Sequence, residues 1–487
     1  MSSENVPMIH LFRTPYNYYL YDVNKNTIIR INKKIYNALN ECITNKKNLL
    51  ANEILNENEK NTIKYMQEAG FLSNRRIQEI IHPASDVLDY YLQNKLNKIT
   101  LQVTQQCNLR CSYCPYTGSY VNRRHTNKAM NFCIAKKGID YLISHSRDSK
   151  RINIGFYGGE PLIEFNLIKQ CLEYANSMAD GKDISFSVSS NATLLNKYII
   201  EVFQKYDVQL LVSLDGPKNI HDKNRRFSIN NHGSFDKVTK VMEFVKEEYP
   251  DYYFKNIRYN AVIDPSNDFS CTNDFFTNFD LVKSSVFTGT QINLNYLNAN
   301  LKYTDDYTIK INYEIFKLFL SKLNKLNSQY VSKLIERNFE NLARIYEHLK
   351  PQDSLPIKAH HSGPCIPGAL RLFMSIDGTF FPCERVSELS SVMKIGHVNN
   401  GMDMEKIKAL LNIGKLTEKS CKNCWAFRFC TLCAVSADNI DSLTSERKQA
   451  ECQKVLISIE ENFKDFCTLK ELNKDFWVRE KEIISII

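Results

Sequence analysis

The stretch Thr104-Gln105-Gln106-Cys107-Asn108-Leu109-Arg110-Cys111-Ser112-Tyr113-Cys114 decides how the rest of the sequence is interpreted. It directly follows an apolar alternating run, residues 99–104, which predicts a buried β-strand. The three thiols therefore belong to a loop at the carboxyl end of a strand, where sites form in barrels of alternating strands and helices. Three thiolates leave one iron of a [4Fe–4S] cube open to a substrate or cofactor. A structural zinc site, the alternative, needs a fourth ligand that this loop lacks.

Strand-like and helix-like runs alternate downstream of this loop. The predicted strands are residues 99–104, 151–157, 184–189, 208–214, 254–263 and 286–294. Helical periodicity separates them, as in residues 128–143, 167–178 and 235–248. This alternation predicts parallel βα units, about six of them, fewer than the eight of a closed barrel. The expected fold class is α/β, with a partial (β/α)6 barrel over residues 99–305.

The CxxxCxxC spacing, with Tyr113 before the last cysteine, resembles the signature of the radical S-adenosylmethionine (radical SAM) superfamily. Phe156-Tyr157-Gly158-Gly159-Glu160-Pro161-Leu162, at the end of the second predicted strand, resembles that family's GGEP motif, which holds the methionyl amino group of the cofactor. Glycines allow close backbone approach, and the carboxylate supplies counter-charge. The resemblance implies further cofactor contacts after the third and fourth strands, at Ser189, Asn191, Ser213 and Arg225, with Arg226 as a neighbouring alternative to Arg225.

A second set of cysteines lies near the carboxyl end of the sequence. Cys365 is followed by twelve residues, Gly378, four residues and Cys383; Cys421-x2-Cys424-x5-Cys430-x2-Cys433 and, 18 residues later, Cys452 complete the set. Paired thiols at these spacings indicate metal binding in a reducing compartment. The order resembles the SPASM extension, which carries two auxiliary [4Fe–4S] clusters. That resemblance implies Cys365, Cys383 and Cys433 on the first cluster, and Cys421, Cys424, Cys430 and Cys452 on the second.

Two departures from the SPASM pattern leave alternatives open. The last gap is two residues rather than three, and the upstream cysteine of some members is absent from Ala359-His360-His361-Ser362. The first auxiliary cluster would then be completed by His360, His361 or Cys467, or would stay open for a substrate sulfur. A zinc ribbon over residues 421–433 is the structural alternative.

Residues 1–80 predict a small α+β module. Alternation from Met8 to Ile31 with turn chemistry at residues 23–27 predicts a β-hairpin, and helical spacing follows up to Gly70. A winged-helix-like module in front of a radical enzyme resembles the RiPP recognition element, which captures the leader of a ribosomally made precursor peptide. Its physical basis is addition of an extended peptide to an open sheet edge. An inert cap or a DNA-binding winged helix is the alternative.

Composition bounds the remaining classes of protein. The 487 residues carry 43% hydrophobic and 24% charged residues, so a globular chain of several domains is expected. A net charge of +9 does not demand nucleic acid, and no apolar stretch is long enough for a membrane span. We therefore expect a cytoplasmic protein that binds neither nucleic acid nor membrane. Cys42, Cys133, Cys171 and Cys271 lie in apolar-periodic segments and are expected to pack in the core.

These resemblances imply a radical SAM oxidoreductase that matures a precursor peptide. S-Adenosylmethionine and three [4Fe–4S] clusters would be its cofactors, and a 5′-deoxyadenosyl radical would take a hydrogen from the peptide, most often to install cysteine thioether links. Its partners would be the precursor and an electron donor such as flavodoxin or ferredoxin. The expected domains are 1–80 (leader binding), 81–98 (linker helix), 99–305 (barrel), 306–350 (bridging helices), 351–470 (SPASM) and 471–487 (a terminal segment).

Several rival functions remain open. An anaerobic sulfatase maturase that makes formylglycine would use an acid after the second auxiliary-region cysteine as its base, and Glu384 after Cys383 has this position. Related maturases form carbon–carbon or ether links or epimerise residues. A non-enzymatic iron–sulfur scaffold would keep the clusters without cleaving the cofactor.

Overall fold

A parallel sheet forms the centre of the computed structural model, which describes residues 6–46, 48–117, 120–179, 181–298, 301–361, 363, 365–473 and 475–477. Six neighbouring strands run parallel, in the order β10-β9-β8-β7-β6-β5. This confirms the six parallel strands expected from the sequence. Their bounds are β5 (Lys98–Thr104), β6 (Arg151–Gly158), β7 (Asp183–Ser190), β8 (Gln209–Ser213), β9 (Ile257–Ile263) and β10 (Val286–Gln291).

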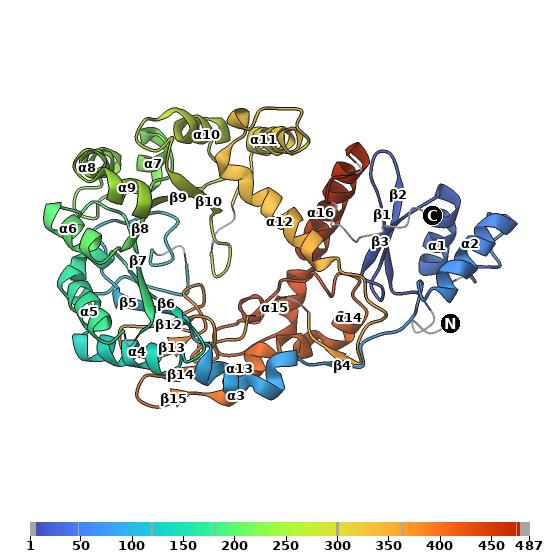
Figure 1. Cartoon of the computed structure of the whole chain (residues 1–487), viewed down its shortest axis with the longest axis horizontal. Helices are drawn as coiled ribbons and strands as arrows, with labels where there is room; N and C mark the ends of the chain where they lie inside the picture. The colour runs from blue at the N-terminus through green and yellow to red at the C-terminus, as the bar shows by residue number, and fades with distance from the viewer. Residues whose placement is uncertain are drawn as a thin grey trace.

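Helices cover the outer face of this curved sheet (Figure 1). They are α4 (Phe132–Ser144), α5 (Phe165–Ser177), α6 (Lys197–Lys205), α7 (Lys218–Asn224), α8 (Phe235–Glu248), α9 (Pro250–Asn256) and α10 (Phe269–Asn278), with the 3-10 turn η3 (Pro161–Glu164) after β6. Helix α8 has the predicted bounds. The predicted strand 254–263 is wrong at its start, because Pro250 initiates α9 and residues 254–256 are helical.

The same sheet continues past β5 into the cysteine-rich part of the chain. Strand β12 (Leu372–Met374) pairs parallel with β5, and β13 (Thr379–Phe381), β14 (Gly396–His397) and β15 (Gly401–Met402) follow antiparallel. The sheet thus has ten strands in the order β10-β9-β8-β7-β6-β5-β12-β13-β14-β15. Residues 372–402, expected in a separate domain, therefore extend the barrel sheet and bring the second cysteine set beside the first.

The N-terminal module contains three antiparallel strands rather than the predicted hairpin. They are β1 (Ile9–Arg13), β2 (Tyr18–Asp22) and β3 (Thr27–Ile31), followed by α1 (Lys33–Asn45) and α2 (Glu57–Glu68). The run Met8–Ile31 was expected to turn once, but Thr14 forms a second turn by accepting from the backbone N–H groups of Tyr16 and Asn17. Strand β2 is central, so β1 and β3 are the two edges.

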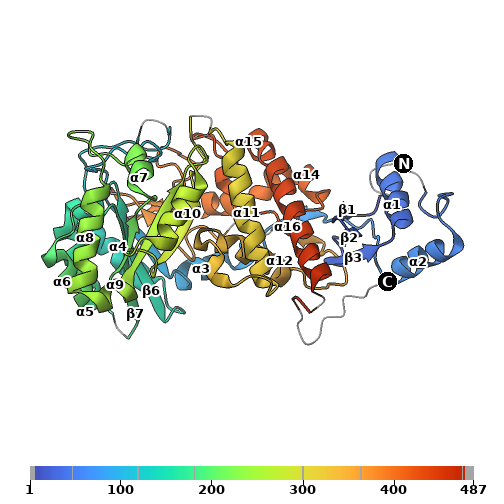
Figure 2. The same cartoon turned by 90° about the horizontal axis from the view of Figure 1, so that it is seen from above.

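This module is packed firmly against the cysteine-rich region. Its sheet lies between α16 (Cys452–Leu472) on one side and α1 and α2 on the other (Figures 1 and 2). The His10 ring stacks on Trp425 with centroids 3.6 Å apart, and His10 Nε2 lies 3.0 Å from Glu460 on α16. One buried apolar cluster joins the two parts through Met8, Phe12, Tyr19, Tyr21, Val23, Phe427, Phe429, Phe463, Phe466 and Cys467.

The segment between barrel and cysteine-rich region consists of helices, as expected. Residues 306–350 form α11 (Asp305–Lys322), the 3-10 turns η4 (Ser328–Tyr330) and η5 (Lys333–Ile335), and α12 (Glu336–His348). Helix α12 packs against α16 and runs from the barrel toward the N-terminal sheet (Figure 1).

Short elements complete the structure. Before the barrel lie β4 (Glu79–Ile80), η2 (Pro83–Val87) and α3 (Leu88–Asn94), and β4 pairs with β11 (Lys358–Ala359). The cysteine-rich region adds α13 (Met404–Leu411), η6 (Ile413–Thr417), α14 (Glu418–Lys422), η7 (Ala434–Ala437) and α15 (Ser445–Ala450). No helix in the described ranges combines the length and apolarity that crossing a bilayer requires.

The scattered cysteines divide into two kinds. Cys42 and Cys171 are buried, as expected. Cys133 on α4 and Cys271 on α10 are exposed, so the prediction of core packing is wrong for these two. Each lies on the solvent side of its helix, where a short thiol is tolerated at no packing cost.

Candidate functional site

The first cysteine loop is held in place by the motif that follows β6. Gly159 N donates to Thr104 O at 2.9 Å, and Glu160 N donates to Gln106 O at 2.8 Å. A Cβ on Gly158 would lie 2.1 Å from Thr104 O, and one on Gly159 would lie 2.0 Å from Gln106 O. Gly158 also has φ +150°. These glycines are therefore required because two loops meet there, a reason not seen in the sequence.

Glu160 of the same motif is buried and fully engaged within the protein. Its carboxylate accepts from Ser190 Oγ at 2.7 Å, Asn191 N at 2.8 Å and Leu162 N at 3.1 Å. Burial raises its pKa, and these donors oppose the rise. Glu160 thus ties the ends of β6 and β7 together beside the cysteine loop.

The thiols of Cys107, Cys111 and Cys114 lie close to one another below the surface. Burial raises the pKa of Cys111 to about 12, with Arg225 opposing and the charge of Cys114 adding to the rise. Burial also raises the pKa of Cys107, and Cys111 and Cys114 add to it. The three groups therefore share one electrostatic environment, and binding iron there would release protons.

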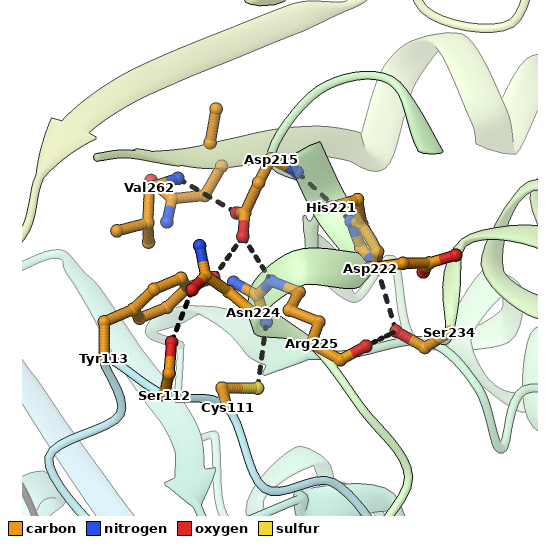
Figure 3. A network of polar contacts seen from close by, with 12 residues as sticks. Cys111, Ser112, Tyr113, Asp215, His221, Asp222, Asn224, Arg225, Ser234 and Val262 are labelled. Carbon is orange, nitrogen blue, oxygen red and sulfur yellow. Dashed lines mark hydrogen bonds and ion pairs between the residues drawn. The ribbon is translucent and has the colours of Figure 1, made fainter. Parts of the chain in front are cut away.

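Arg225 reaches this loop from the segment after α7, as Figure 3 shows. Its Nε donates to Asp215 Oδ2 at 2.9 Å, and its guanidinium lies 5.4 Å from the centroid of the Tyr113 ring. The Tyr113 hydroxyl donates to the same carboxylate, whose other oxygen accepts from Val262 N at 3.0 Å. Arg225 Nη1 is 4.0 Å from Cys111 Sγ. A buried cation, a carboxylate and an aromatic ring therefore adjoin the cysteine loop.

A second layer of contacts fixes the ion pair of Arg225 and Asp215. His221 is fully buried; its Nδ1 accepts from Asp215 N at 3.3 Å and its Nε2 is 2.9 Å from Ser234 Oγ. Burial lowers the pKa of His221 to about 4, so the ring is neutral at pH 7 and can accept that N–H (Figure 3). Arg226 instead donates to Asn231 O and does not line the cavity described next, which favours Arg225 over its neighbour.

A cavity of about 810 Å³ opens inside the carboxyl ends of the parallel strands. All of the predicted cofactor-contacting residues line it, together with the first cysteine set and Glu384: Tyr113, Gly158, Gly159, Glu160, Ser189, Asn191, Ser213, Arg225, Cys107, Cys111, Cys114 and Glu384. Asparagines from several elements form much of the remaining wall: Asn122, Asn260, Asn293, Asn295, Asn338 and Asn341. The residues predicted from the sequence therefore surround one cavity, although its amide lining was not predicted.

Arg123 links the cysteine loop to the segment after Cys383. Its side chain is 1% exposed and its Nε lies 2.7 Å from Glu388 Oε1. Arg123 Nη2 donates to Glu384 O at 2.5 Å and to Val386 O at 3.3 Å. Three rings surround the guanidinium: Tyr116, Tyr157 and Phe373. Sequence reasoning missed this residue, because no local pattern reveals a partner more than 250 positions away.

The C-terminal cysteines fall into two neighbourhoods. Burial raises the pKa of Cys383 to about 11, and Glu384, Cys365 and Cys433 add to the rise. Burial raises the pKa of Cys424 to about 12, with additions from Cys430, Cys421 and Cys452. The thiols that influence one another are thus the two sets that the resemblance to the SPASM extension implies.

The three candidates for a fourth ligand of the first auxiliary set have other partners in the structure. His360 Nδ1 is 3.0 Å from His361 O, and its Nε2 accepts from Gly414 N at 2.8 Å. His361 accepts from Gly363 N and lies against Cys430, which belongs to the other set. Cys467 is buried in the apolar cluster that joins α16 to the N-terminal sheet. The hydrogen bonds of His360 and His361 and the packing of Cys467 thus involve groups other than the thiols of Cys365, Cys383 and Cys433.

Residues 101–263 match the model of the Radical SAM superfamily. This segment, which holds the first cysteine loop and β5 to β9, is a radical SAM domain. The proteins that share it include enzymes of radical chemistry, and this protein is such an enzyme.

The chain is similar to several curated proteins. It is 24% identical to the radical SAM cyclopropyl synthase TigE of Paramaledivibacter caminithermalis, over 69% of this chain and 67% of that protein. It is also 24% identical to a cysteine-type anaerobic sulfatase-maturating enzyme of Clostridium novyi, over 69% of this chain and 86% of the relative. An uncharacterized protein of Methanocaldococcus jannaschii is 39% identical, but over only 25% of this chain and 39% of that protein's length.

The fold is shared with a solved structure, native anSMEcpe with bound AdoMet. The TM-score is 0.56 at 19% identity, and the match covers 77% of this chain and 98% of the other. At this identity the similarity concerns the fold.

The superfamily implies S-adenosylmethionine and one [4Fe–4S] cluster, and the residues in the cavity fit that pair. In the described part of the chain, no three His, Cys, Asp or Glu side chains converge as tightly as ligands of one ion. A cubane places each thiolate on a different iron, so its ligands stand further apart than those of a single zinc ion. Three thiols, the Arg225 guanidinium and several amides line the same cavity, and this donor set suits a cluster with three thiolate ligands and a polar cofactor.

Proposed function

We propose that this protein is a radical SAM maturase that acts on a ribosomally synthesised precursor peptide and installs thioether links from its cysteines. Cys107, Cys111 and Cys114 would hold the cluster that binds S-adenosylmethionine, and the two C-terminal sets would hold auxiliary [4Fe–4S] clusters. When bound and reduced, these cofactors supply a 5′-deoxyadenosyl radical that abstracts hydrogen. A flavodoxin or ferredoxin would be the electron donor.

The part of this chain in that chemistry is orientation and exclusion of water. The buried pair of Arg225 and Asp215 presents a fixed cation beside the cysteine loop, where the resemblance places the cofactor's carboxylate. The Arg123 contacts hold Glu384 at the cavity wall, between the two cysteine sets. These groups are ordered by the protein before any ligand arrives, so little reorganisation is needed on binding.

The first auxiliary cysteine set carries the proposal of sulfur chemistry. Cys365, Cys383 and Cys433 adjoin one another, while His360, His361 and Cys467 lie with other partners. A cluster held by three thiolates keeps one iron for an outside ligand. A substrate cysteine on that iron would be held as a thiolate near the cavity. This arrangement favours thioether formation over chemistry that needs no substrate sulfur.

The cavity lining supports a peptide substrate. Asparagine amides donate and accept hydrogen bonds without charge, which matches the backbone of an extended peptide. Asn341 on α12 lines both this cavity and a smaller one of about 350 Å³ between α12 and α16. That groove continues along α12 past Arg344 and His348 toward the N-terminal sheet. A peptide following it would join the proposed leader-binding module to the reacting cavity.

The N-terminal module is proposed to hold the leader. Strand β1 faces α16, whereas β3 ends the sheet on the other side without a strand partner in the described chain. Edge strands accept extended peptides through their free N–H and C=O groups. We therefore expect amide protection at Thr27–Ile31 when the leader binds.

Sulfatase maturation is the second candidate, because Glu384 lies in the cavity directly after Cys383. A base at this place fits removal of a proton from an oxidised cysteine or serine side chain. Two of the similar proteins are named as sulfatase-maturating enzymes.

Replacing Cys107, Cys111 and Cys114 together with Ala tests the catalytic cluster. About four irons should be lost while the auxiliary irons stay, and anaerobic formation of 5′-deoxyadenosine should stop. Undiminished formation of 5′-deoxyadenosine would refute the assignment.

Mass spectrometry of the product separates the two candidates. A short cysteine-rich peptide encoded beside this gene should lose two hydrogens for each link and gain no aldehyde. A sulfatase-derived peptide should stay unmodified. An aldehyde in place of a cysteine thiol, lost in the variant Glu384→Gln, would establish the second candidate instead.

A further inference from the structure

Lys448 on α15 is a buried lysine without a carboxylate partner. Its residue is 1% exposed, among the largest fully buried side chains of the chain. Its Nζ donates to Thr417 Oγ1 at 2.7 Å and lies 3.7 Å from Cys421 Sγ. Among the described residues, no Asp or Glu oxygen forms an ion pair with it. Lysine is almost never buried in this way without a compensating negative charge.

The negative charge that suits Lys448 is the second auxiliary cysteine set. Cys421 is its direct neighbour, and Cys452 Sγ donates to the Lys448 backbone carbonyl at 3.7 Å. The lysine also lowers the pKa of Cys430 and Cys452 against the effect of their burial. Three of the four cysteines of this set therefore feel its charge. A cluster with four thiolates is an anion and would supply the missing counter-charge.

Thr417 extends the contact. The ammonium of Lys448 only donates, so Thr417 Oγ1 accepts from it and keeps its own hydrogen for another acceptor. Cys421 Sγ lies 3.2 Å from that oxygen. When Cys421 is a thiolate, the Thr417 hydroxyl can donate to its sulfur, which completes a chain of contacts from Lys448 through Thr417 to Cys421.

We propose that Lys448 is the counter-charge of the second auxiliary cluster and, with Thr417, sets its reduction potential. This inference rests on the proposed cluster at Cys421, Cys424, Cys430 and Cys452. A nearby cation and a hydrogen bond to a ligand sulfur stabilise the reduced form, which carries one more negative charge than the oxidised form. The second auxiliary cluster is therefore tuned to accept an electron more readily than it would without Lys448.

Three variants of the reconstituted full-length protein test the proposal. Lys448→Met removes the charge with little change in volume, and Thr417→Val removes the hydroxyl alone. Lys454→Met is the matched control, because Lys454 is only two residues from Cys452 but 65% exposed and paired with Glu451. Iron is counted first, and each cluster's midpoint potential is then followed by electron paramagnetic resonance during an anaerobic redox titration.

The Met variant should shift the midpoint of one cluster to a more negative potential, the Val variant should shift it less, and the control should leave it unchanged. Loss of about four irons from Lys448→Met, together with a negative shift in Thr417→Val, also supports the proposal. Unchanged midpoints in Lys448→Met and Thr417→Val at full iron content would overturn it. If Cys421→Ala with Cys424→Ala keeps all the iron of the parent protein, the cluster itself is absent and the proposed function fails instead.

Discussion

At the residue scale, Arg225 has two roles: it is expected to bind the cofactor, and it also stabilises the folded structure around the cysteine loop. The family resemblance implies that Arg225 contacts the cofactor. The structure adds a buried ion pair with Asp215 and a cation–π contact with the Tyr113 ring. Both partners of the pair are nearly inaccessible to solvent, so their charges are weakly screened. Loss of activity after changing Arg225 would therefore not distinguish a lost ligand contact from a damaged loop.

Replacing Asp215 with Asn measures what the ion pair with Arg225 contributes to the stability of the fold. The Arg225 guanidinium would stay buried without its counter-charge, so we expect a loss of about 3–5 kcal/mol in stability. The matched control is Asp183→Asn, which breaks a pair with Arg151 whose side chains are 64% and 88% exposed. That change should cost less than about 1 kcal/mol. Thermal unfolding of the cluster-free proteins measures both, and equal shifts would contradict the argument.

Much of the candidate site could be predicted from residue types and their spacing in the sequence. The division of the C-terminal cysteines into two sets came from the resemblance to the SPASM extension, because spacing along the chain does not by itself join Cys433 to Cys365 and Cys383. Asp215, Arg123 and Lys448 were missed for a common reason: their partners lie on distant elements. Lys448 in particular follows Ser445-Glu446-Arg447, a stretch that is typical of an exposed helix.

Helix α16 shows at the element scale how one helix serves two surfaces. It begins at Cys452, a member of the second auxiliary cysteine set, and it also contacts strand β1 of the N-terminal sheet. Thr14, Asn17 and Tyr19 all donate to Glu471 near its end at 2.7 Å. Helix periodicity predicted the bounds of α8, whereas the strand 254–263 was misjudged because aromatic residues suit both states.

Asp465 on α16 makes this helix sensitive to pH. Burial raises its pKa from 3.8 to about 6, with Glu461 adding to the rise and Lys464 opposing it. Between about pH 4 and pH 6 the folded state binds more protons than the unfolded state, so this residue lowers stability as pH rises and the full cost is present above pH 6.

Asp465→Asn should therefore raise the unfolding temperature at pH 8, by an amount worth about 1–2 kcal/mol after allowance for partial exposure. The gain should shrink at pH 5. Asp441→Asn, in the exposed loop before α15, is the control and should change little at either pH. A gain that is constant between pH 5 and pH 8 would exclude Asp465 titration as its source.

At the scale of the whole molecule, the parts expected as separate domains are joined twice. Strands β12 to β15 extend the barrel sheet, and the N-terminal module shares an apolar cluster with α16 and the cysteine-rich region. The alternation of strands and helices predicted the six parallel strands, because it is a local pattern. The joints were not predicted, since they pair residues hundreds of positions apart.

The apolar cluster shared with α16 predicts that removing the N-terminal module would destabilise the rest of the protein. Phe12, 2% exposed, packs against Tyr19 and Phe463, so Phe12→Ala should cost about 3–5 kcal/mol and speed proteolysis of residues 74–80. Tyr16→Ala in the turn between β1 and β2, 70% exposed, is the control and should leave both the stability and the proteolysis rate unchanged. If the two variants behave alike, the module is held by something other than this apolar cluster. Leader binding is better tested by amide exchange at β3 than by truncation.

The stacked rings of His10 and Trp425 make the molecule its own optical reporter. The sequence has two tryptophans, and Trp425 directly follows Cys424, while Trp477 packs on Phe339 and Tyr346. An iron–sulfur chromophore assembled beside Trp425 absorbs at its emission wavelengths and would quench it. Filling of the proposed second auxiliary site would therefore be readable from intrinsic fluorescence. Trp477→Phe would remove the background, and His10→Ala would give the emission of Trp425 without the stacked ring of the N-terminal sheet.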